Sequence, residues 1–552
     1  MLNMMVFGIM LYIISLLLMF LSLNMIFNVS IYIFEWEIYE FNSMKFNMII
    51  LVDDMTLLFM MLVSLISSLI MLYSMKYMNL NENDLKRFYY LLMLFIFSMY
   101  FMILSPNMLT IILGWDGLGL ISFCLIVYYQ NFKAMSAGLL TMILNRIGDA
   151  SLLMIMGLMC MNGSWNLMLY NMDNLLLMMM ILVSFTKSAQ MPFSLWLPAA
   201  MMAPTPVSSL VHSSTLVTAG IYVMIRYSNL MSDEIKMKLM LISSFTMLMS
   251  GLYANYEIDF KKIIALSTLS QLGFMMSILF LGYKDLAFFH LYIHAMFKSL
   301  MFMCAGSYIH YNYSIQDVRD YSGMMSIYPI KGLIFIFTSL SLTGFPFLLG
   351  FFSKDLIMEE FFNNKLMMLN MMNLLLGTIF TVSYSTRLYL LLMYNKSVKF
   401  KYNMIMEDKM MNLVMFKLMM ISLIYGKYYF MLLYSLYNIN LSMILKLMLL
   451  KMLILGIMFG YFNYKNYNFS MNMISLMFKN MNYLNKFYNN SYMIFFNMIF
   501  KYELLIEKKI LHLILNEYVN FMVNLLKFEY KMNYYLLMLS YLFMMMFMYL
   551  MI

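Results

Sequence analysis

The sequence predicts an all-α polytopic membrane protein with about 15 transmembrane helices, two of them broken, and a C-terminal lateral helix. Composition is the first reason. Hydrophobic residues make up 64% of the 552 residues and charged residues 11%, whereas a soluble domain carries roughly 25% charged residues. The second reason is that apolar runs long enough to cross ~30 Å of hydrocarbon recur along nearly the whole chain. We therefore expect one helical bundle without a soluble catalytic domain.

The charge and cysteine patterns argue against several other functions. The net charge is +9, but the lysines are scattered in short loops and near the C-terminus. A membrane protein explains that pattern better than a nucleic-acid-binding protein, which would gather them in a basic stripe. Cys124, Cys160 and Cys304 lie far apart and form no CxxC pair, so we expect no disulfide framework, iron–sulfur cluster or metal site.

The individual spans follow from the apolar runs and the polar residues that interrupt them. They cover residues 4–27, 49–73, 88–104, 107–129, 136–160, 174–203 (broken), 207–228, 238–256, 263–281, 286–310, 332–362 (broken), 368–394, 410–435, 440–462 and 534–552.

Other segments are expected to lie outside these spans. Alternating apolar and polar residues at 31–47 predict a short β-hairpin on the bundle. Residues 463–492 are rich in Asn and Tyr and predict a loop, and the charged residues 493–531 predict the lateral helix. The N-terminus has no basic region, cleavage site or Arg-rich amphipathic stretch, so we expect it to form a retained first span.

Ionisable residues inside the predicted spans carry the functional signal. Each costs at least ~2.5 kcal/mol at the bilayer centre unless it is paired or hydrated. The residues singled out as informative are Asp116, Arg146, Asp149, Lys187, His212, His290, His294, Lys298, Lys354, Asp355 and Arg387.

Two of these lysines adjoin predicted helix breaks. Four of the seven prolines fall in residues 192–206, directly after Lys187, and proline both removes a backbone donor and clashes with the preceding turn. Gly344, Pro346 and Gly350 come just before Lys354. Two breaks, each beside a lysine, predict two structural repeats with a site in each. Snorkelling of Lys187 to the membrane interface is the alternative.

His290, His294 and Lys298 form the clearest pattern. Positions i, i+4 and i+8 drift by only ~40° per step around a helix, so the three side chains form one polar stripe. Imidazole exchanges protons near neutral pH, and a desolvated lysine can do so as well. We therefore favour proton transfer along the stripe over purely structural hydrogen bonds. Metal binding is disfavoured because no carboxylate or thiol accompanies the histidines at ligand spacing.

Two carboxylates are expected to have cationic partners. Asp116 lies among Gly114, Gly117 and Gly119, which would let a neighbouring helix approach closely, and Lys187 is its expected partner. Arg146 and Asp149, at i and i+3, are expected to pair with each other, and a structural role fits them at least as well as a functional one.

These motifs together resemble the chain 5 family of respiratory NADH–ubiquinone oxidoreductase (complex I), a relative of Mrp-type sodium/proton antiporter subunits. The matching stretches, within roughly residues 110–360, are GWDGLGLISF, NRIGD, KSAQMPFSLWLPAAMMAPTPVSSLVHSSTLVTAG, DFKKIIALSTLSQLG, HLYIHAMFKSLMFMCAGS, QDVRD and GFPFLLGFFSKD. The block from 187 to 220 is highly specific. The family commonly has Glu where this chain has Asp116, and the N-terminus is one span shorter than in the longer members.

The resemblance implies a proton-pumping membrane-arm subunit of the mitochondrial respiratory chain, driven by electron transfer in other subunits. NADH, FMN, iron–sulfur clusters and ubiquinone would belong to those subunits, and this chain would hold no cofactor. Asp116 and Lys187 would form one half-channel, His212, His290, His294 and Lys298 the central axis, and Lys354 with Asp355 the exit. A free-standing cation/proton antiporter is the main alternative, and an inert scaffold is a third.

The expected domain organisation follows the same scheme. Residues 1–87 would form N-terminal spans and the hairpin, 88–228 and 238–394 the two antiporter-like halves, 395–492 additional spans and a loop, 493–531 the lateral helix, and 532–552 an anchor span. Other membrane-arm subunits and lipids, cardiolipin among them, would be its partners, and nucleic acid would not.

The location is expected to be the mitochondrial inner membrane, with the N-terminus in the matrix and the C-terminus in the intermembrane space. Loops with more basic residues stay on the matrix side. The basic residues assigned to that side are Lys76, Lys86, Arg87, Lys133, Lys261, Lys262, Arg319 and Lys331, and those assigned to the opposite side are Lys45, Arg226, Lys236, Lys238 and Lys284.

Overall fold

The computed structural model describes residues 2–465 apart from seven gaps at 42–43, 79–81, 171–173, 313, 365–367, 395–406 and 435–440. It also describes residues 477–479, 481, 516, 517 and 520. The predicted loop at 463–492 falls largely outside the described residues. The predicted lateral helix at 493–531 also lies outside them, apart from residues 516, 517 and 520. The predicted last span at 534–552, and the anchor segment 532–552 that contains it, lie outside them entirely.

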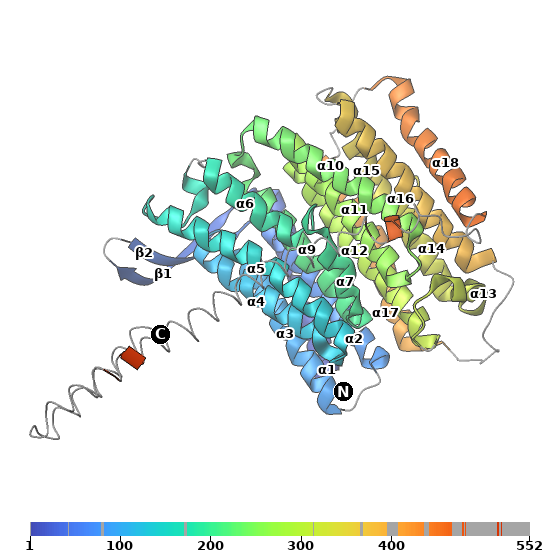
Figure 1. Ribbon diagram of the computed structural model, residues 1–552, viewed down its shortest axis with the longest axis horizontal. Coiled ribbons are helices and arrows are strands. Elements are labelled where there is room, and N and C mark those ends of the chain that lie inside the picture. Colours follow the sequence, from blue (N-terminus) through green and yellow to red (C-terminus); the bar gives the residue numbers. More distant parts are fainter. Residues whose placement is uncertain are drawn as a thin grey trace, which may run out of the picture. The chain divides into compact units, whose positions relative to one another are not determined.

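The described part is a helical bundle with one small sheet (Figure 1). Twelve of its helices are long and apolar enough to cross a membrane, which confirms the all-α membrane fold. The first half consists of α1 Leu2–Asn28, β1 Tyr32–Phe41, β2 Met44–Val52, α2 Asp54–Tyr77, α3 Glu82–Leu104, α4 Met108–Ile126, α5 Phe132–Cys160, α6 Asn174–Lys187, α7 Trp196–Ala199, α8 Thr205–Val207, the π-helix η5 Ser208–Thr215 and α9 Leu216–Tyr227.

The second half continues with α10 Asp233–Tyr256, α11 Phe260–Leu281, α12 Lys284–Tyr311, α13 Met324–Ile327, α14 Pro329–Thr343, α15 Leu349–Asn363, α16 Met368–Tyr394, α17 Lys409–Tyr434 and α18 Met443–Lys465. Short 3₁₀ turns join several of these elements, at Val127–Tyr129, Leu167–Leu169, Phe193–Leu195, Ala200–Met202, Ser228–Leu230 and Val318–Tyr321.

Both predicted breaks are present. The span predicted at 174–203 is α6 followed by a series of short helical turns, and the span predicted at 332–362 is α14 followed by α15. At the second break, Gly344 has φ +82° and ends α14 in the left-handed conformation that suits glycine. The remaining described spans match long helices, with ends that differ by a few residues.

The second span is the main boundary that the sequence analysis placed wrongly. It was predicted from residue 49, but residues 49–52 belong to β2, which pairs antiparallel with β1. The helix begins after Asp53, whose carboxylate accepts from the backbone N–H of Thr56 at 2.8 Å, while the Thr56 hydroxyl accepts from Asp53 N–H at 2.9 Å. This capping box fixes the helix start, and apolar residues alone do not reveal it.

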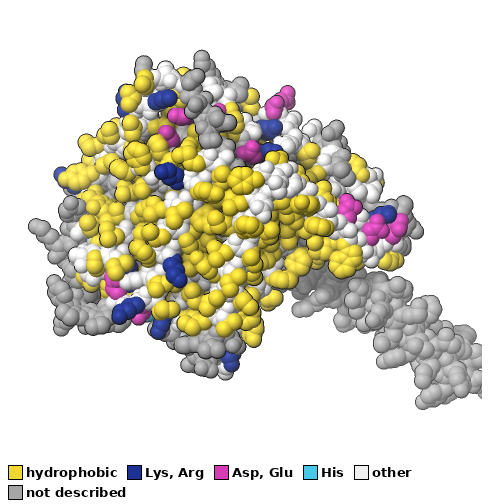
Figure 2. Space-filling model, turned by 180° about the vertical axis from the view of Figure 1, so that it is seen from behind, with side chains coloured by type: hydrophobic (Ala, Val, Ile, Leu, Met, Phe, Trp, Pro, Cys, Tyr) yellow, Lys and Arg dark blue, Asp and Glu magenta, His cyan; other side chains and the backbone are white. Residues whose placement is uncertain are grey.

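The polar helices lie in the centre of the bundle. An 18-residue apolar stretch of each of the spans α8–η5–α9, α11 and α12 is completely buried, whereas α1 and α18 bury only 22% and 11% of the corresponding stretch. In Figure 1, α11 and α12 lie between α3–α5 on one side and α16 and α18 on the other. Figure 2 shows apolar side chains over much of one outer face. Polar residues inside α11 and α12 are therefore shielded from lipid by other helices.

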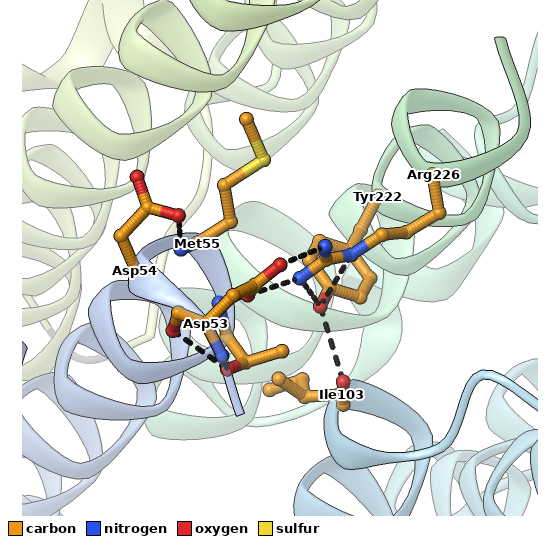
Figure 3. A network of polar contacts seen from close by, with 7 residues as sticks. Asp53, Asp54, Met55, Ile103, Tyr222 and Arg226 are labelled. Carbon is orange, nitrogen blue, oxygen red and sulfur yellow. Dashed lines mark hydrogen bonds and ion pairs between the residues drawn. The ribbon is translucent and has the colours of Figure 1, made fainter. Parts of the chain in front are cut away.

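An ion-pair network joins three elements at one end of the bundle (Figure 3). Arg226 of α9 donates from both terminal nitrogens to the Asp53 carboxylate, at 2.5 and 2.8 Å, and also donates to the Tyr222 hydroxyl. That hydroxyl in turn donates to the Ile103 carbonyl of α3 at 3.1 Å. The bidentate pair thus fastens the start of α2 to α9 and α3.

This network predicts a pH-dependent contribution to stability. Burial acts to raise the pKa of Asp53, but hydrogen bonds from Arg226 and its charge outweigh burial and hold the pKa below the usual value. A lowered folded-state pKa stabilises the protein above the unfolded pKa of ~3.9, and the contribution is lost as the pH falls through the folded pKa. Asp53→Asn should cost about 1.5–3 kcal/mol at pH 7. Melting curves of both proteins should differ at pH 7 and converge below pH ~4. A constant difference across this range would contradict the assignment.

Candidate functional site

Lys187 is fully buried at the end of α6. Its Nζ donates to the Trp115 carbonyl at 2.9 Å and lies 4.4 Å from the centre of the Trp115 ring. Helix α9 approaches closely because of Gly220, where an added Cβ would lie 2.7 Å from the Ser184 carbonyl oxygen. The lysine therefore sits inside the bundle at the break, and the snorkelling alternative is wrong.

Asp116 does not form the expected buried pair with Lys187. Its side chain is 39% exposed, and the partner within ion-pair distance is Arg146, at 4.0 Å. Asp116 follows Trp115 by one position, which turns its side chain ~100° around α4, away from the carbonyl that binds the lysine. Gly114 and Gly117 do permit close packing, against Met102 and Ser98, whereas Gly119 has open space beside it.

Asp149 is the carboxylate that the sequence analysis undervalued. Arg146 pairs with Asp149 at 3.1 Å, as expected, and the Asp149 side chain is only 11% exposed. Of the charges that act on Lys187, Asp149 has the largest electrostatic effect and Asp116 the next largest. The close approach of α5 and α6 at Gly148, where an added Cβ would lie 2.3 Å from Thr186 Oγ1, explains this proximity. The NRIGD motif contained this signal, since its glycine immediately precedes the carboxylate.

His212 lies buried in the π-helix η5. The Ser214 and Thr215 hydroxyls donate back to the Leu210 carbonyl at 2.9 and 2.7 Å, which supports the wider turn. Neither ring nitrogen of His212 has a hydrogen-bond partner within the described part of the chain. Because η5 packs against α12, the histidine belongs to the same buried region as the stripe on α12.

The stripe on α12 lies in the centre of the bundle, and all three of its side chains are fully buried. The two ring nitrogens of His290 are 2.8 Å from Ser353 Oγ and 3.3 Å from Gln271 Oε1. The His290 and His294 rings are 6.3 Å apart. Lys298 donates to the Ser267 hydroxyl at 2.5 Å. The stripe thus faces α11 and α15 through polar side chains.

Lys354 binds inside the second break. Its Nζ donates to the carbonyl of Leu342, near the C-terminal end of α14. Gly350 brings the two half-helices together, because an added Cβ there would lie 1.8 Å from the Ser341 carbonyl oxygen. At each break a lysine therefore donates to a backbone carbonyl, Lys187 to that of Trp115 in α4 and Lys354 to that of Leu342 in α14.

Asp355 faces a cavity of about 230 Å³ beside the break, which Lys354 also lines. The two residues form no ion pair in the described structure, and Asp355 interacts electrostatically with Glu359 and Lys446. Lys446 of α18 lines the same cavity, together with Thr378 and Thr381 of α16. Lys446 was not among the residues singled out from the sequence, although it lies within the span predicted at 440–462.

Arg387 binds the C-terminal end of α10. It is 1% exposed and donates to the carbonyls of Ala254, Asn255 and Glu257, which end α10. A buried guanidinium is thereby matched to the unsatisfied carbonyls of a helix C-terminus. Among the described residues, no group of three or more His, Cys, Asp or Glu side chains could hold a metal ion.

Two family models match this chain. Residues 105–381 match the family described as NADH:quinone oxidoreductase/Mrp antiporter, TM. Residues 36–89 match the family described as NADH-Ubiquinone oxidoreductase (complex I), chain 5 N-terminus. NADH-ubiquinone oxidoreductase chain 5 of Apis mellifera ligustica is 51% identical over 446 residues, which cover 80% of each chain. The chain belongs to the NADH–ubiquinone oxidoreductase chain 5 family.

Other members of the chain 5 family are similar over shorter stretches. The Aedes aegypti protein is 51% identical over 65% of this chain and 63% of its own length. The Lumbricus terrestris protein is 44% identical over the same shares. This chain is accordingly a proton-translocating membrane subunit of complex I, the mitochondrial NADH:ubiquinone reductase, and the free-standing antiporter is disfavoured.

Solved structures support the fold. A chain of the Mrp complex from Dietzia sp. DQ12-45-1b aligns over 88% of this chain and 57% of its own length, with a TM-score of 0.71 and 22% identity. A chain of the membrane-bound sulfane sulfur reductase, an archaeal respiratory membrane complex, aligns over 72% and 68%, with a TM-score of 0.65 and 20% identity. The antiporter-like fold is thus shared at low sequence identity.

Proposed function

We propose that the buried lysines and histidines of this chain carry protons across the membrane, with Lys187, the α12 stripe and Lys354 as the main stations. The observation that carries the proposal is the stripe itself. His290, His294 and Lys298 are fully buried on one helix between the two breaks, and polar side chains of α11 and α15 contact His290 and Lys298. Ionisable groups at such depth in a membrane protein mark proton relays.

The charge state of Lys187 is the step that the carboxylates around it would control. A nearby carboxylate favours the protonated lysine, and burial favours its release when that carboxylate is neutralised. Arg146 reaches both Asp149, at 3.1 Å, and Asp116, at 4.0 Å. A shift of Arg146 between these two acids would change how much negative charge Lys187 experiences. Asp116 therefore stays in the proposed half-channel, acting through Arg146 and not through a direct pair.

Protons would leave through the cavity at the second break. Lys354 and Asp355 both line it, and Lys446 lies at its α18 wall. The proposed halves, residues 88–228 and 238–394, would each contain one break with a buried lysine beside it. His212, on the π-helix packed against α12, would connect them.

Location and partners are also proposed. The family supports the mitochondrial inner membrane and other complex I subunits as neighbours, and the apolar outer faces of α1 and α18 suit either neighbouring subunits or lipid, cardiolipin included. We place the N-terminus in the matrix and the C-terminus in the intermembrane space. Lys76, Lys86, Arg87 and Lys133 favour this orientation, whereas Lys261 and Lys331 are buried and no longer count as loop residues.

Lys354→Met tests the exit. The purified complex, reconstituted in liposomes, should keep oxidising NADH but translocate fewer protons per electron, because methionine fills the space and cannot bind a proton. Lys451→Met, on the exposed face of α18 and outside the cavity lining, is the matched control and should keep the wild-type ratio. A wild-type ratio in Lys354→Met would refute the proposed exit.

A further inference from the structure

A further buried lysine, Lys331, lies outside the path described above. Lys331, in the first turn of α14, is fully buried. Its Nζ lies 3.6 Å from the centre of the Tyr311 ring and 5.1 Å from that of Tyr328, and the two rings stack at 4.9 Å. The faces of two aromatic rings attract a cation, so this cage suits a protonated lysine.

The cage does not satisfy the lysine completely. An ammonium has three N–H donors, yet Lys331 Nζ has no hydrogen-bond partner and no carboxylate oxygen within 4.0 Å among the residues that the structure describes. A buried cation is stable only when it is paired or strongly hydrogen-bonded. Lys331 therefore has the surroundings of a group that changes its charge or its partner.

Two partly exposed acidic residues interact with this lysine. Glu407 and Asp408 precede α17, are partly exposed and interact electrostatically with Lys331, Glu407 more strongly. The backbone N–H of Asp408 donates to the Tyr311 hydroxyl at 2.9 Å, so the same tyrosine contacts the acidic segment and the lysine. Glu407 Oε1 is buried and has no hydrogen-bond partner in the described residues. A proton acceptor that reaches the surface is thus held next to a buried one.

Polar groups continue from Lys331 along α12 toward Lys298. The Cys304 thiol interacts electrostatically with Lys331 and lies six residues, or ~9 Å, beyond Lys298 on the same helix. The Tyr73 hydroxyl donates to the Met303 carbonyl at 3.0 Å. At Gly306 an added Cβ would meet both Thr205 Oγ1, at 2.5 Å, and Tyr73 Oη, at 2.8 Å. Hydroxyl and thiol groups therefore flank α12 between the two lysines.

The titratable and charged groups around Lys331 come from each neighbouring element. They are Cys304, Tyr308, His310 and Tyr311 of α12, Tyr328 before α14, and Glu407 and Asp408 before α17. Tyr77 of α2 contacts the His310 ring at 5.5 Å. Among these described groups, the only carboxylates are Glu407 and Asp408, which precede α17.

We propose that Lys331 and Glu407 form a further proton-binding site, at which protons enter from the surface beside α17 and pass along α12 toward Lys298. This inference rests on the proposed function of the α12 stripe. Glu407 takes a proton at the surface and gives it to the neutral amine of Lys331, and the tyrosine cage holds the resulting cation. Loss of that proton toward α12 returns the amine to its neutral form, so one proton enters and one leaves.

The test compares Lys331→Arg, Lys331→Met and Glu407→Gln in the intact complex. Arginine keeps the positive charge and the contacts with the rings but cannot release a proton. If Lys331 conducts protons, Lys331→Arg should assemble and lower the number of protons translocated per electron to the level of Lys187→Met. Glu407→Gln should lower it as well. Lys86→Met, at an exposed lysine of α3, should leave it unchanged.

A merely structural role gives a different pattern. Wild-type proton-to-electron ratios in Lys331→Arg would overturn the proposal, even if Lys331→Met failed to assemble. If both lysine variants failed to assemble, a wild-type ratio in Glu407→Gln would overturn it and a lowered ratio would support it. If Lys187→Met also kept the wild-type ratio, the proposed function itself would be wrong. A lowered ratio in Lys187→Met alone would refute only the entrance.

Discussion

Replacement of Lys187 by methionine should abolish the proton translocation that depends on this chain and leave the complex assembled. The lysine is fully buried where α6 ends, and its hydrogen bond to Trp115 is made to a carbonyl of another helix. Methionine has a similar length and fits the apolar surroundings, so packing should survive while the proton-binding amine is lost. The measurement is the number of protons translocated per electron in liposomes that contain the purified complex.

The control for this variant is Lys133→Met, at an exposed lysine in the first turn of α5. It removes the same charge from the same half of the chain, but at the surface. We therefore expect pumping and assembly to remain unchanged. Asp149→Asn should weaken pumping more than Asp116→Asn, because Asp149 is the stronger electrostatic partner of Lys187. Normal coupling in Lys187→Met would remove the lysine from the path.

Replacement of Arg387 by methionine should destabilise the second half of the bundle severely. Three carbonyls at the end of α10 would lose their donor inside the protein. Each buried acceptor left unsatisfied costs about 1–3 kcal/mol. The loss is therefore large compared with the net stability of a folded domain, about 5–15 kcal/mol. We expect poor assembly or a clearly lowered melting temperature.

Arg319→Met is the comparison for that experiment. Arg319 is 53% exposed and pairs with Asp317 at the surface, and exposed pairs contribute roughly 0–1 kcal/mol. Thermal unfolding of the purified complexes should therefore separate the two variants widely. Similar melting temperatures would show that Arg387 does not stabilise α10. Arg387→Lys should fall between them, because lysine keeps the charge but not the branched donors.

The sequence by itself determined the membrane class, nearly all described spans, both breaks and the stripe on α12. These features depend on local patterns. Apolar length sets a span, proline and glycine interrupt a helix, and a spacing of four residues fixes the direction of side chains. Local patterns also revealed the hairpin, although the capping box at Asp53 was overlooked and the following helix was started too early.

Only the tertiary structure decided which charged groups meet. It directed Lys187 to the Trp115 carbonyl, brought Asp149 closer to it electrostatically than Asp116, and gave Arg387 a role at the end of α10. It also buried Lys331, which the sequence analysis had assigned to a loop. The reason is physical. A side chain's partners are set by how neighbouring helices rotate and how closely they approach, and glycines at positions such as Gly148 and Gly220 permit contacts whose distant partners sequence spacing cannot identify.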